Sequence, residues 1–128
     1  TSVSVKEAHE EGDVLFRKGD PAHYAFLLLM GRVHLKMGEA GQVVHMVNRP
    51  GETFGWSSLV GSNVYSATAE CVMPTTLRKL HREDLRKLLL KDPANGLIFF
   101  QRLAAMLGER LVESYARYEK VFSHKIYV

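Results

Sequence analysis

Residues 24–47 read YAFLLLMGRVHLKMGEAGQVVHMV, and this stretch decides the fold class. It begins with a continuous apolar run, Tyr24–Met30, which is typical of a strand buried on both faces. The following segment, Arg32–Met37, alternates polar and apolar side chains, so one face is expected to point inward. That face carries Val33, Leu35 and Met37. The glycines at both ends of residues 38–41 predict a hairpin to a further strand over residues 42–47.

Turn-forming residues recur on both sides of this stretch at intervals of about 7–12 residues, the rhythm of an all-β sandwich or barrel. Short strands are predicted between the turns over residues 14–16 and 75–80. Another strand is expected to place one set of alternating side chains inward: Ala67, Ala69, Cys71 and Met73. The expected fold is mostly β, an antiparallel β jelly roll (double-stranded β-helix) over residues ~10–80, followed by helices.

The hydrophobic period changes after residue 80. Residues 81–91 carry leucines at helical spacing with Glu83 and Asp84 in the first turn, which predicts a short helix. Asp92 and Pro93 then provide an N-cap and a first helical residue, so a long helix is expected from Pro93 to about Tyr118. We expect residues 1–92 to form a jelly-roll domain of ligand-binding type, and residues 93–128 to form a dimerisation helix with a C-terminal tail.

The long helix has two apolar stripes. One stripe steps alternately by four and three residues, as in a coiled-coil seam: Phe100, Ala104, Leu107, Leu111, Ser114 and Tyr118. The other stripe contains Phe99, Leu103 and Met106 and suits packing on the chain's own sandwich. A homodimer is therefore expected, and one wide core face is the alternative.

Composition narrows the class of protein. The chain has 128 residues, is 46% hydrophobic and 24% charged, and carries a net charge of +3, which excludes intrinsic disorder. Its longest apolar run, residues 25–30, is far too short to span a membrane. The single cysteine, Cys71, excludes an intrachain disulfide and fits a cytoplasmic protein. The N-terminal sequence lacks an initiator Met, so we expect the chain to begin inside a longer gene product.

Enzyme motifs are absent from the sequence. It contains neither a phosphate-binding loop that ends in Gly-Lys-Ser/Thr nor a Gly-x-Gly-x-x-Gly fingerprint. Its closest histidines lie eleven residues apart, unlike the paired metal ligands of a cupin. We therefore expect a protein that is not an enzyme, with no catalytic residue, no metal site and no cofactor.

The segment Pro50–Val60, PGETFGWSSLV, is the best candidate for a binding site. A strand meets Gly55, and a helical turn with small side chains follows, which leaves backbone N–H groups free to hold an anion.

The wider pattern resembles the cyclic-nucleotide-binding domain of the catabolite activator family. Residues 11–20 (EGDVLFRKGD) look like the first barrel turn of that family, and residues 25–35 resemble its next two strands. Residues 54–68 look like its phosphate-binding cassette, and residues from Pro93 onward resemble its dimerising helix. The resemblance implies that ligand contacts come from one set of residues: Phe54, Gly55, Trp56, Ser57, Ser58, Tyr65, Ser66, Ala67, Thr68, Arg110, Ser114 and Tyr115.

The cassette departs from the family pattern at two positions. Trp56 stands where the family has a Glu that accepts the ribose hydroxyl, and Tyr65 stands where it has an Arg that pairs with the cyclic phosphate. Arg49 and Arg110 are candidates for a replacement charge. Losing one partner of a buried charge pair costs about 2–5 kcal/mol. We therefore expect cyclic AMP and cyclic GMP to bind weakly or not at all.

Three interpretations stay open at this point. In the first, the pocket takes another small anionic ligand, with Trp56 available for stacking and Tyr65 for a phenol hydrogen bond. In the second, the chain is a genuine cyclic-nucleotide receptor with a rearranged site. In the third, the chain is a dimerisation scaffold that binds no ligand. No nucleic-acid contact is expected from this chain alone, because about ten residues after Tyr118 cannot hold a helix-turn-helix.

Overall fold

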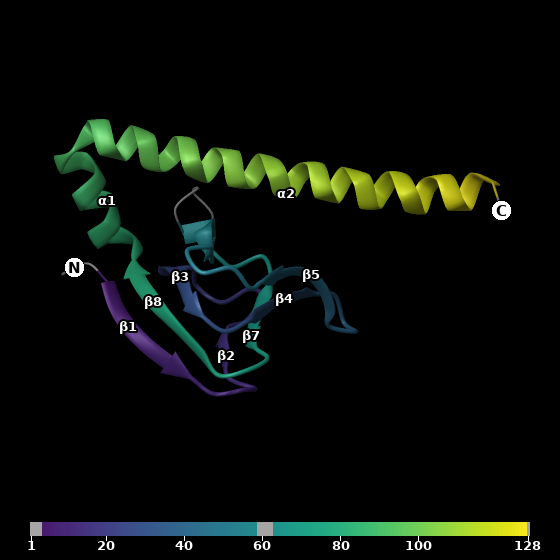
Figure 1. Cartoon of the computed structure of the whole chain (residues 1–128), viewed down its shortest axis with the longest axis horizontal. Coiled ribbons are helices and arrows are strands. Elements are labelled where there is room, and N and C mark those ends of the chain that lie inside the picture. Colours follow the sequence, from purple (N-terminus) through teal and green to yellow (C-terminus); the bar gives the residue numbers. More distant parts are fainter. Residues whose placement is uncertain (1–3, 59–62, 128) are drawn as a thin grey trace. The chain divides into compact units, whose positions relative to one another are not determined.

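Eight strands pair into two antiparallel sheets, and two helices follow them in the described part of the chain (Figure 1). The computed structural model describes residues 4–58 and 63–127, with the side chains of Ser58, Tyr118 and 120–127 left aside. The strands are β1 (Ser4–His9), β2 (Val14–Phe16), β3 (Tyr24–Met30), β4 (Val33–Met37), β5 (Gln42–Val47), β6 (Thr53–Phe54), β7 (Thr68–Cys71) and β8 (Thr75–His81). The helices are the 3-10 turn η1 (Trp56–Ser58), α1 (Arg82–Lys91) and α2 (Pro93–Tyr127).

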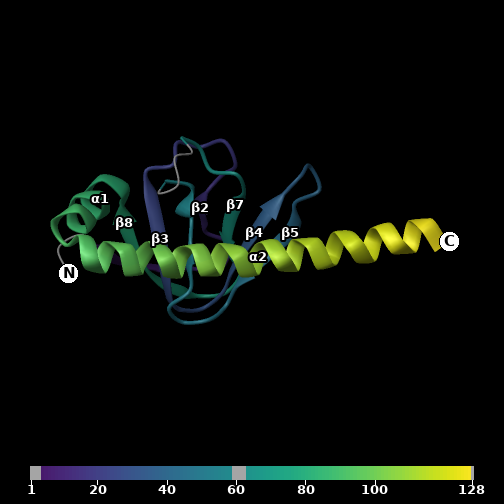
Figure 2. The ribbon, with the colours of Figure 1, turned by 90° about the horizontal axis from the view of Figure 1, so that it is seen from above.

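Each sheet has four strands that are not consecutive in sequence. The first has the order β1-β8-β3-β6, and the second has the order β2-β7-β4-β5. Such crossing between sheets is typical of a jelly roll: among the described strands every connection passes from one sheet to the other except β4–β5. Figure 2 shows the β4–β5 hairpin, whose turn is closed by a bond from the Gly41 N–H to the Gly38 carbonyl. The predicted antiparallel jelly-roll fold is thus confirmed.

The core lies between the two sheets and is filled by alternating side chains from both. Its buried members form one cluster: Phe16, Ala22, Phe26, Leu28, Val33, Leu35, Val47, Phe54, Tyr65, Ala67, Ala69, Cys71 and Leu77. In β3, Phe26 and Leu28 belong to this cluster, and Ala25 on the other face is buried too, which agrees with a strand covered on both sides. Burial of these side chains is the main source of stability for the β unit.

Two side chains predicted to point into the core are instead exposed. Met37 is the last residue of β4 and is 38% exposed, and Met73 is 40% exposed. Both predictions followed the alternation one step too far. Met37 is the last residue of β4 before the Gly38 turn, and Met73 lies beyond the end of β7 at Cys71.

The chain divides into two compact units, one up to Leu88 and one from Leu89. In the second unit, the Asp92 carboxylate accepts a hydrogen bond from the Asn95 N–H at 3.3 Å, as the predicted N-cap requires. The predicted end of α2 near Tyr118 is wrong, because the helix continues to Tyr127. Residues 119–127 contain neither glycine nor proline, so nothing in the sequence breaks the helix there. Among the described helices, none is both long and apolar enough to cross a membrane.

Candidate functional site

Gly55 is the second residue of the predicted cassette and lies between β6 and η1. Gly55 has a φ of 69°, which disfavours any residue with a Cβ, and its Cα faces two aromatic rings. A Cβ at this position would lie 2.9 Å from Cδ2 of Phe26 and 3.3 Å from Cε2 of Phe16. Glycine is therefore needed here for both conformation and space, and it lets η1 lie beside β3.

Four aromatic rings pack beneath the two ends of the cassette. Phe16 lies at their centre, with its ring centroid 3.8 Å from that of Tyr65, 5.6 Å from that of Phe26 and 6.4 Å from that of Phe54. Phe26 and Phe54 also stack on each other at 5.2 Å. Since Phe54 precedes Gly55 and Tyr65 lies at the far end of the cassette, these rings join its beginning to its end. We call Phe16, Phe26, Phe54 and Tyr65 the aromatic cluster.

The Tyr65 hydroxyl is bonded to the backbone of one residue of β3. It donates to the carbonyl of Tyr24 at 2.6 Å and accepts from the N–H of Tyr24 at 3.1 Å. The side chain is only 4% exposed. Burial raises the pKa of the phenol above its ordinary value of 10.0, and the hydrogen bond that the phenol oxygen accepts from the Tyr24 N–H partly offsets that effect.

This contact pairs the part of the β3 edge that the short strand β6 does not reach. Further along β3, the same edge is used by Leu28, whose N–H donates to the carbonyl of Glu52 and whose carbonyl accepts from the N–H of Gly51. Backbone groups four residues apart in a strand point to the same side, so the groups of Tyr24 point to this edge as well. The Tyr65 hydroxyl thus takes the place of a further pairing strand, and it meets both the donor and the acceptor of the Tyr24 backbone.

The backbone at the end of the cassette is paired with the turn before β3. The N–H of Tyr65 donates to the carbonyl of Asp20 at 3.0 Å, and the Tyr65 carbonyl accepts from the N–H of Gly19 at 2.9 Å. The N–H of Ala22 donates to the carbonyl of Asn63 at 2.9 Å, and Pro21 forms a bridge with Val64. Residues 63–65 are therefore fixed to residues 19–22 by backbone as well as side-chain contacts.

The remaining cassette residues divide into enclosed and open positions. Ala67 and Ser57 are buried, and Trp56 is half-buried. Thr68 is also half-buried, and its Oγ1 accepts a hydrogen bond from the N–H of Lys18 at 3.0 Å. Ser66 is exposed. The backbone of Ser58 lies in η1, and its side chain is outside the described part.

Three predicted ligand contacts belong to the second unit. Arg110 is half-buried and its Nη2 lies 3.8 Å from the sulfur of Met106, while Ser114 donates its hydroxyl to the carbonyl of Arg110 at 3.0 Å. Tyr115 is 61% exposed. Arg110 and Ser114 share one face of α2, and a ligand contact from any of the three residues stays a prediction.

The two apolar stripes of α2 differ in the exposure of their side chains. Leu103 is buried and Phe99 and Met106 are half-buried. On the seam, Phe100 is 43% exposed and Leu111 is 51% exposed. Ala104 and Ser114 are exposed as well, and Leu107 is half-buried, whereas Tyr118 lies beyond the described side chains. The seam therefore presents apolar surface to solvent in the single chain.

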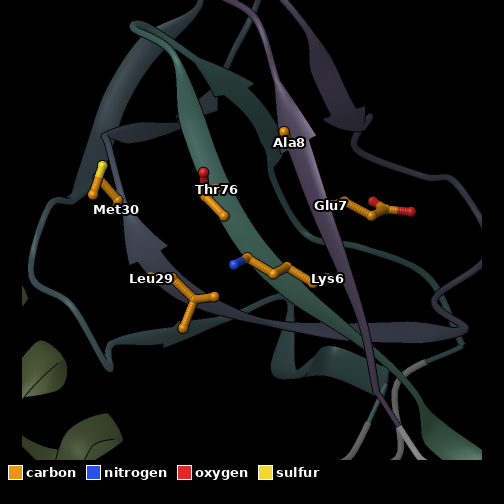
Figure 3. Close-up of a pocket in the computed structure, with 6 residues that line it drawn as sticks. All are labelled: Lys6, Glu7, Ala8, Leu29, Met30 and Thr76. Atoms are coloured by element: carbon orange, nitrogen blue, oxygen red, sulfur yellow. The ribbon is translucent and has the colours of Figure 1, made fainter.

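A shallow cavity of about 470 Å³ lies on the other face of the first sheet (Figure 3). It is lined by residues of β1, β3 and β8: Lys6, Glu7, Ala8, Leu29, Met30 and Thr76. In Figure 3 the Lys6 side chain extends toward Leu29, whereas Glu7 points away from the others. The sequence does not predict this cavity, because its pattern does not indicate β1. Charged residues interrupt β1, and its apolar Val5 is 62% exposed, so the strand lacks a clear hydrophobic alternation.

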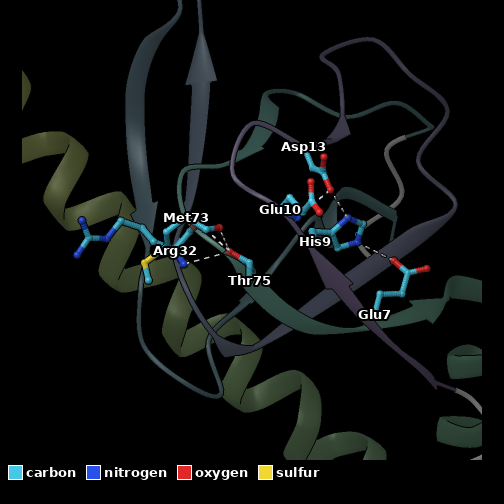
Figure 4. Close-up of polar contacts among 7 residues, drawn as sticks. All are labelled: Glu7, His9, Glu10, Asp13, Arg32, Met73 and Thr75. Carbon is cyan, nitrogen blue, oxygen red and sulfur yellow. Dashed lines mark hydrogen bonds and ion pairs between the residues drawn. The ribbon is translucent and has the colours of Figure 1, made fainter.

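Two polar clusters join the ends of strands (Figure 4). The His9 ring lies between two carboxylates, with Nε2 3.0 Å from Oε1 of Glu7 and Nδ1 3.3 Å from Oδ2 of Asp13. The same oxygen of Asp13 accepts the N–H of Glu10 at 3.0 Å, which fixes the turn between β1 and β2. In the second cluster, the Thr75 hydroxyl accepts from the N–H of Arg32 and so joins β8 to the β3–β4 turn.

The lone thiol is enclosed in the core. Cys71 is fully buried, and this burial raises its pKa above the ordinary value of 9.0, an effect partly offset by a hydrogen bond with Thr75. A neutral, buried thiol is a poor nucleophile, which supports the structural role expected from its place in the alternation.

Known proteins resemble this chain in both sequence and structure. The cyclic AMP receptor protein of Thermus thermophilus is 31% identical over 112 residues, which are 85% of this chain and 50% of that protein. A cyclic nucleotide-binding domain from Methylobacillus flagellatus superposes with a TM-score of 0.81 at 30% identity, covering 91% of this chain and 66% of the other. The catabolite activator protein of Thermus thermophilus superposes with a TM-score of 0.76 at 29% identity, covering 94% of this chain and 55% of the other.

These alignments extend over nearly the whole chain, yet the chain spans only half of the receptor's length. The family described as the cyclic nucleotide-binding domain matches residues 6–92, which contain both sheets except for the first two residues of β1, together with the aromatic cluster and the predicted cassette. The chain therefore belongs to the cyclic nucleotide-binding domain family, and its relatives include the catabolite activator proteins.

Proposed function

We propose that this chain is a regulatory sensor domain that is not an enzyme and binds cyclic AMP and cyclic GMP weakly or not at all. The observation that carries the proposal is the state of Tyr65, which stands at the position of the phosphate-binding Arg. Its hydroxyl is bonded twice to the backbone of Tyr24 and its ring is stacked on Phe16. Both hydrogen-bonding functions of the phenol are thus used inside the protein rather than offered to a ligand.

The expected loss of affinity is large. An anionic phosphate without its cationic partner loses about 2–5 kcal/mol, and a ribose hydroxyl without its carboxylate acceptor loses roughly 1–3 kcal/mol more. These losses would convert a micromolar site into one of millimolar affinity or weaker. Ser66 and Trp56 remain available for another small anionic ligand, since Ser66 is exposed and Trp56 is only half-buried.

A direct titration tests this proposal. Isothermal calorimetry of the purified chain with cyclic AMP and then cyclic GMP is expected to give no saturable heat at ligand concentrations of about 100 μM, tenfold or more below the expected dissociation constant. A dissociation constant in the low micromolar range would contradict the proposal and favour the alternative of a genuine receptor with a rearranged site. Arg49→Ala and Arg110→Ala would then identify the replacement charge.

We further propose that a second copy of the chain covers the seam of α2. Phe100 and Leu111 are 43% and 51% exposed, although each stabilises a protein by about 1.5–3 kcal/mol when fully buried. The same stripe repeats every seven residues, which is the period at which two helices pack along their length. A homodimer is consistent both with a sensor and with the scaffold alternative, because dimerisation through α2 does not require an occupied cassette.

A further inference from the structure

We propose that the shallow cavity on the outer face of the first sheet is a binding site for a small aliphatic carboxylate, whose charge pairs with the ammonium group of Lys6 (Figure 3). We call this cavity the outer cavity. Its lining residues belong to β1, β3 and β8, and none of them is a residue of the predicted cassette. The inference therefore does not rest on the proposed function.

A β-bulge gives the outer cavity its apolar side. Where β3 pairs with β8, Leu28 lies opposite Leu77 and Met30 lies opposite Thr76, so Leu29 is an extra residue in β3. Neighbouring side chains of a regular strand point to opposite faces, but here Leu29 and Met30 both line the cavity. Met30 is 69% exposed and is thus available for contact with a ligand. The cavity volume of about 470 Å³ is within the range of roughly 300–1,000 Å³ that small-ligand sites have.

Lys6 supplies a positive charge to the outer cavity. Figure 3 shows that its side chain starts on β1, crosses β8 and extends toward Leu29. Its methylene groups lie along the sheet and its ammonium group reaches the apolar side of the cavity. No ion pair among the described residues includes Lys6. The carboxylate of Glu7 points away from the other lining residues, and its Oε1 lies 3.0 Å from Nε2 of His9.

A second cation lies directly opposite Lys6. In the register of β1 and β8, Lys6 pairs with Arg78 and Ala8 pairs with Thr76, so these four side chains share one face. Like charges that oppose each other in a sheet destabilise it, and the Arg78 guanidinium bonds only an uncharged group, the Ser4 hydroxyl at 3.3 Å, among the described residues. A bound anion beside Lys6 would offset this repulsion. Thr76 also lines the cavity, and its hydroxyl is a donor for a carboxylate oxygen.

The charge and the lining of the outer cavity determine the class of ligand. Lys6 and Arg78 favour an anion, whereas Ala8, Leu29 and Met30 offer only apolar side chains to the rest of the ligand. A sugar or a nucleoside would bring hydroxyl groups that these side chains cannot bond, and leaving such groups without partners is unfavourable. A carboxylate on a short alkyl chain satisfies both parts of the cavity.

An NMR titration of the unmodified chain with octanoate tests the proposal. Saturable shifts are expected at the amides of Lys6, Ala8 and Thr76 and at the methyl group of Met30, with a dissociation constant of about 1 mM or lower. Acetate keeps the carboxylate without the chain, and octan-1-ol keeps the chain without the charge. Each is expected to bind at least tenfold more weakly, because the burial of two methylene groups, or one hydrogen bond to a charged group, is worth about tenfold in affinity.

Lys6→Met is the informative variant, because it keeps an unbranched side chain and removes the charge. Lys6 is exposed on an edge strand, so the fold should be retained. Octanoate is expected to bind about tenfold more weakly to this variant, whereas binding of octan-1-ol should not change. Lys87→Met is the matched control, since it makes the same change in net charge at an exposed position of α1 outside the cavity. It should leave octanoate binding unchanged.

Several outcomes would overturn the proposal. One is the lack of saturable shifts at about 10 mM octanoate, tenfold above the expected dissociation constant, or shifts centred on Trp56 and Ser66 of the cassette. Equal affinity for octanoate and octan-1-ol would exclude recognition by Lys6, and equal affinity for octanoate and acetate would exclude a role for the apolar side. Equal losses in the two lysine variants would indicate general charge attraction only. The probe comparison needs no variant, and none of these results depends on the titration with cyclic nucleotides.

Discussion

Gly31 lies so close to Thr75 that a Cβ on Gly31 would fall 2.5 Å from the Thr75 hydroxyl oxygen and 2.7 Å from its Cα. The same hydroxyl accepts from the N–H of Arg32 at 3.3 Å and donates to the carbonyl of Met73 at 2.9 Å. The turn between β3 and β4 is therefore tied to the beginning of β8 at a point where only glycine fits. Gly31 also has a φ of 112°, outside the range that other residues adopt readily.

Gly31→Ala is expected to destabilise the fold more than an ordinary glycine substitution. Both the unfavourable φ and the clash with Thr75 contribute, and the free energy of unfolding should fall by roughly 3 kcal/mol or more. Gly12→Ala is the control, because Gly12 has a similar φ of 93° but open space around it. Urea unfolding measures the loss in the free energy of unfolding for both variants, and the difference between the two losses is the cost of the clash. Equal losses would show that the contact with Thr75 contributes nothing.

Restoring the two family residues of the cassette should restore affinity. Trp56→Glu together with Tyr65→Arg supplies a carboxylate and a guanidinium, and cyclic AMP is expected to bind at least tenfold more tightly than to the unmodified chain. The same change removes the contacts of Tyr65 with Phe16 and Tyr24, so it should also lower the free energy of unfolding by about 2–4 kcal/mol. Calorimetry and urea unfolding measure the two effects. A folded double variant with no gain in affinity would argue against the assignment of the cassette as the binding site.

The free energy of unfolding in alkaline solution should depend on two buried groups of the core, the Cys71 thiol and the Tyr65 phenol. Folding raises the pKa of Cys71 and of Tyr65, so the unfolded chain loses these protons first. The contribution of each neutral group is fully present below its ordinary pKa and is lost as the pH rises through the folded pKa. The free energy of unfolding should therefore decline above pH 9.0 for Cys71 and above pH 10.0 for Tyr65.

Variants separate the two contributions. Cys71→Ala is expected to remove the decline that begins near pH 9, and Tyr65→Phe the one that begins near pH 10, each with a limiting slope of about 1.4 kcal/mol per pH unit. Urea unfolding between pH 7 and pH 11 measures both. If a variant retains the full decline in the free energy of unfolding, the group that was removed is ionised to the same extent in the folded and the unfolded chain and does not cause the decline.

The seam of α2 predicts the oligomeric state. Leu107→Glu together with Leu111→Glu places charges in the middle of the stripe, and it should convert a dimer into a folded monomer, because buried carboxylates would repel across the interface. Val112→Glu is the control, since Val112 is 65% exposed and lies off the stripe. Sedimentation velocity at tens of micromolar measures the mass. An unmodified chain that sediments as a monomer at that concentration would refute the seam.

The strands that the sequence predicts well are those with an uninterrupted period. Residues 32–37 alternate cleanly before a glycine turn, and β4 and β5 occur on either side of that turn as expected. By contrast, β1 was missed because it is an edge strand, paired on one side only, and tolerates charged residues that hide the alternation. The end of α2 was placed too early because a helix stops where its sequence breaks it, and residues 119–127 contain no such break.

The candidate site was likewise predictable from the sequence only in part. The helical turn after Gly55 was readable from the sequence, because a strand ends at Phe54 and a glycine with small residues follows it. The direction of the Tyr65 side chain was not readable, because its hydroxyl meets Tyr24, 41 residues away, at an edge of β3 left uncovered by the short β6. No local pattern reports an unpaired sheet edge that the fold creates, so only the structure identifies the partner of that hydroxyl.

The burial of Cys71 has a practical consequence for spectroscopy. Because the single thiol of this chain is enclosed and its pKa is raised, maleimides and methanethiosulfonates should leave it unmodified at neutral pH while the protein is folded. A cysteine placed at the exposed Ser66 or Ser114 would then be the only reactive one, so fluorophores or spin labels can be attached site-specifically without first replacing the native residue. Paired labels at Ser114 in two copies would measure the separation of the helices, and a label at Ser66 would report the motion of the cassette when candidate ligands are added.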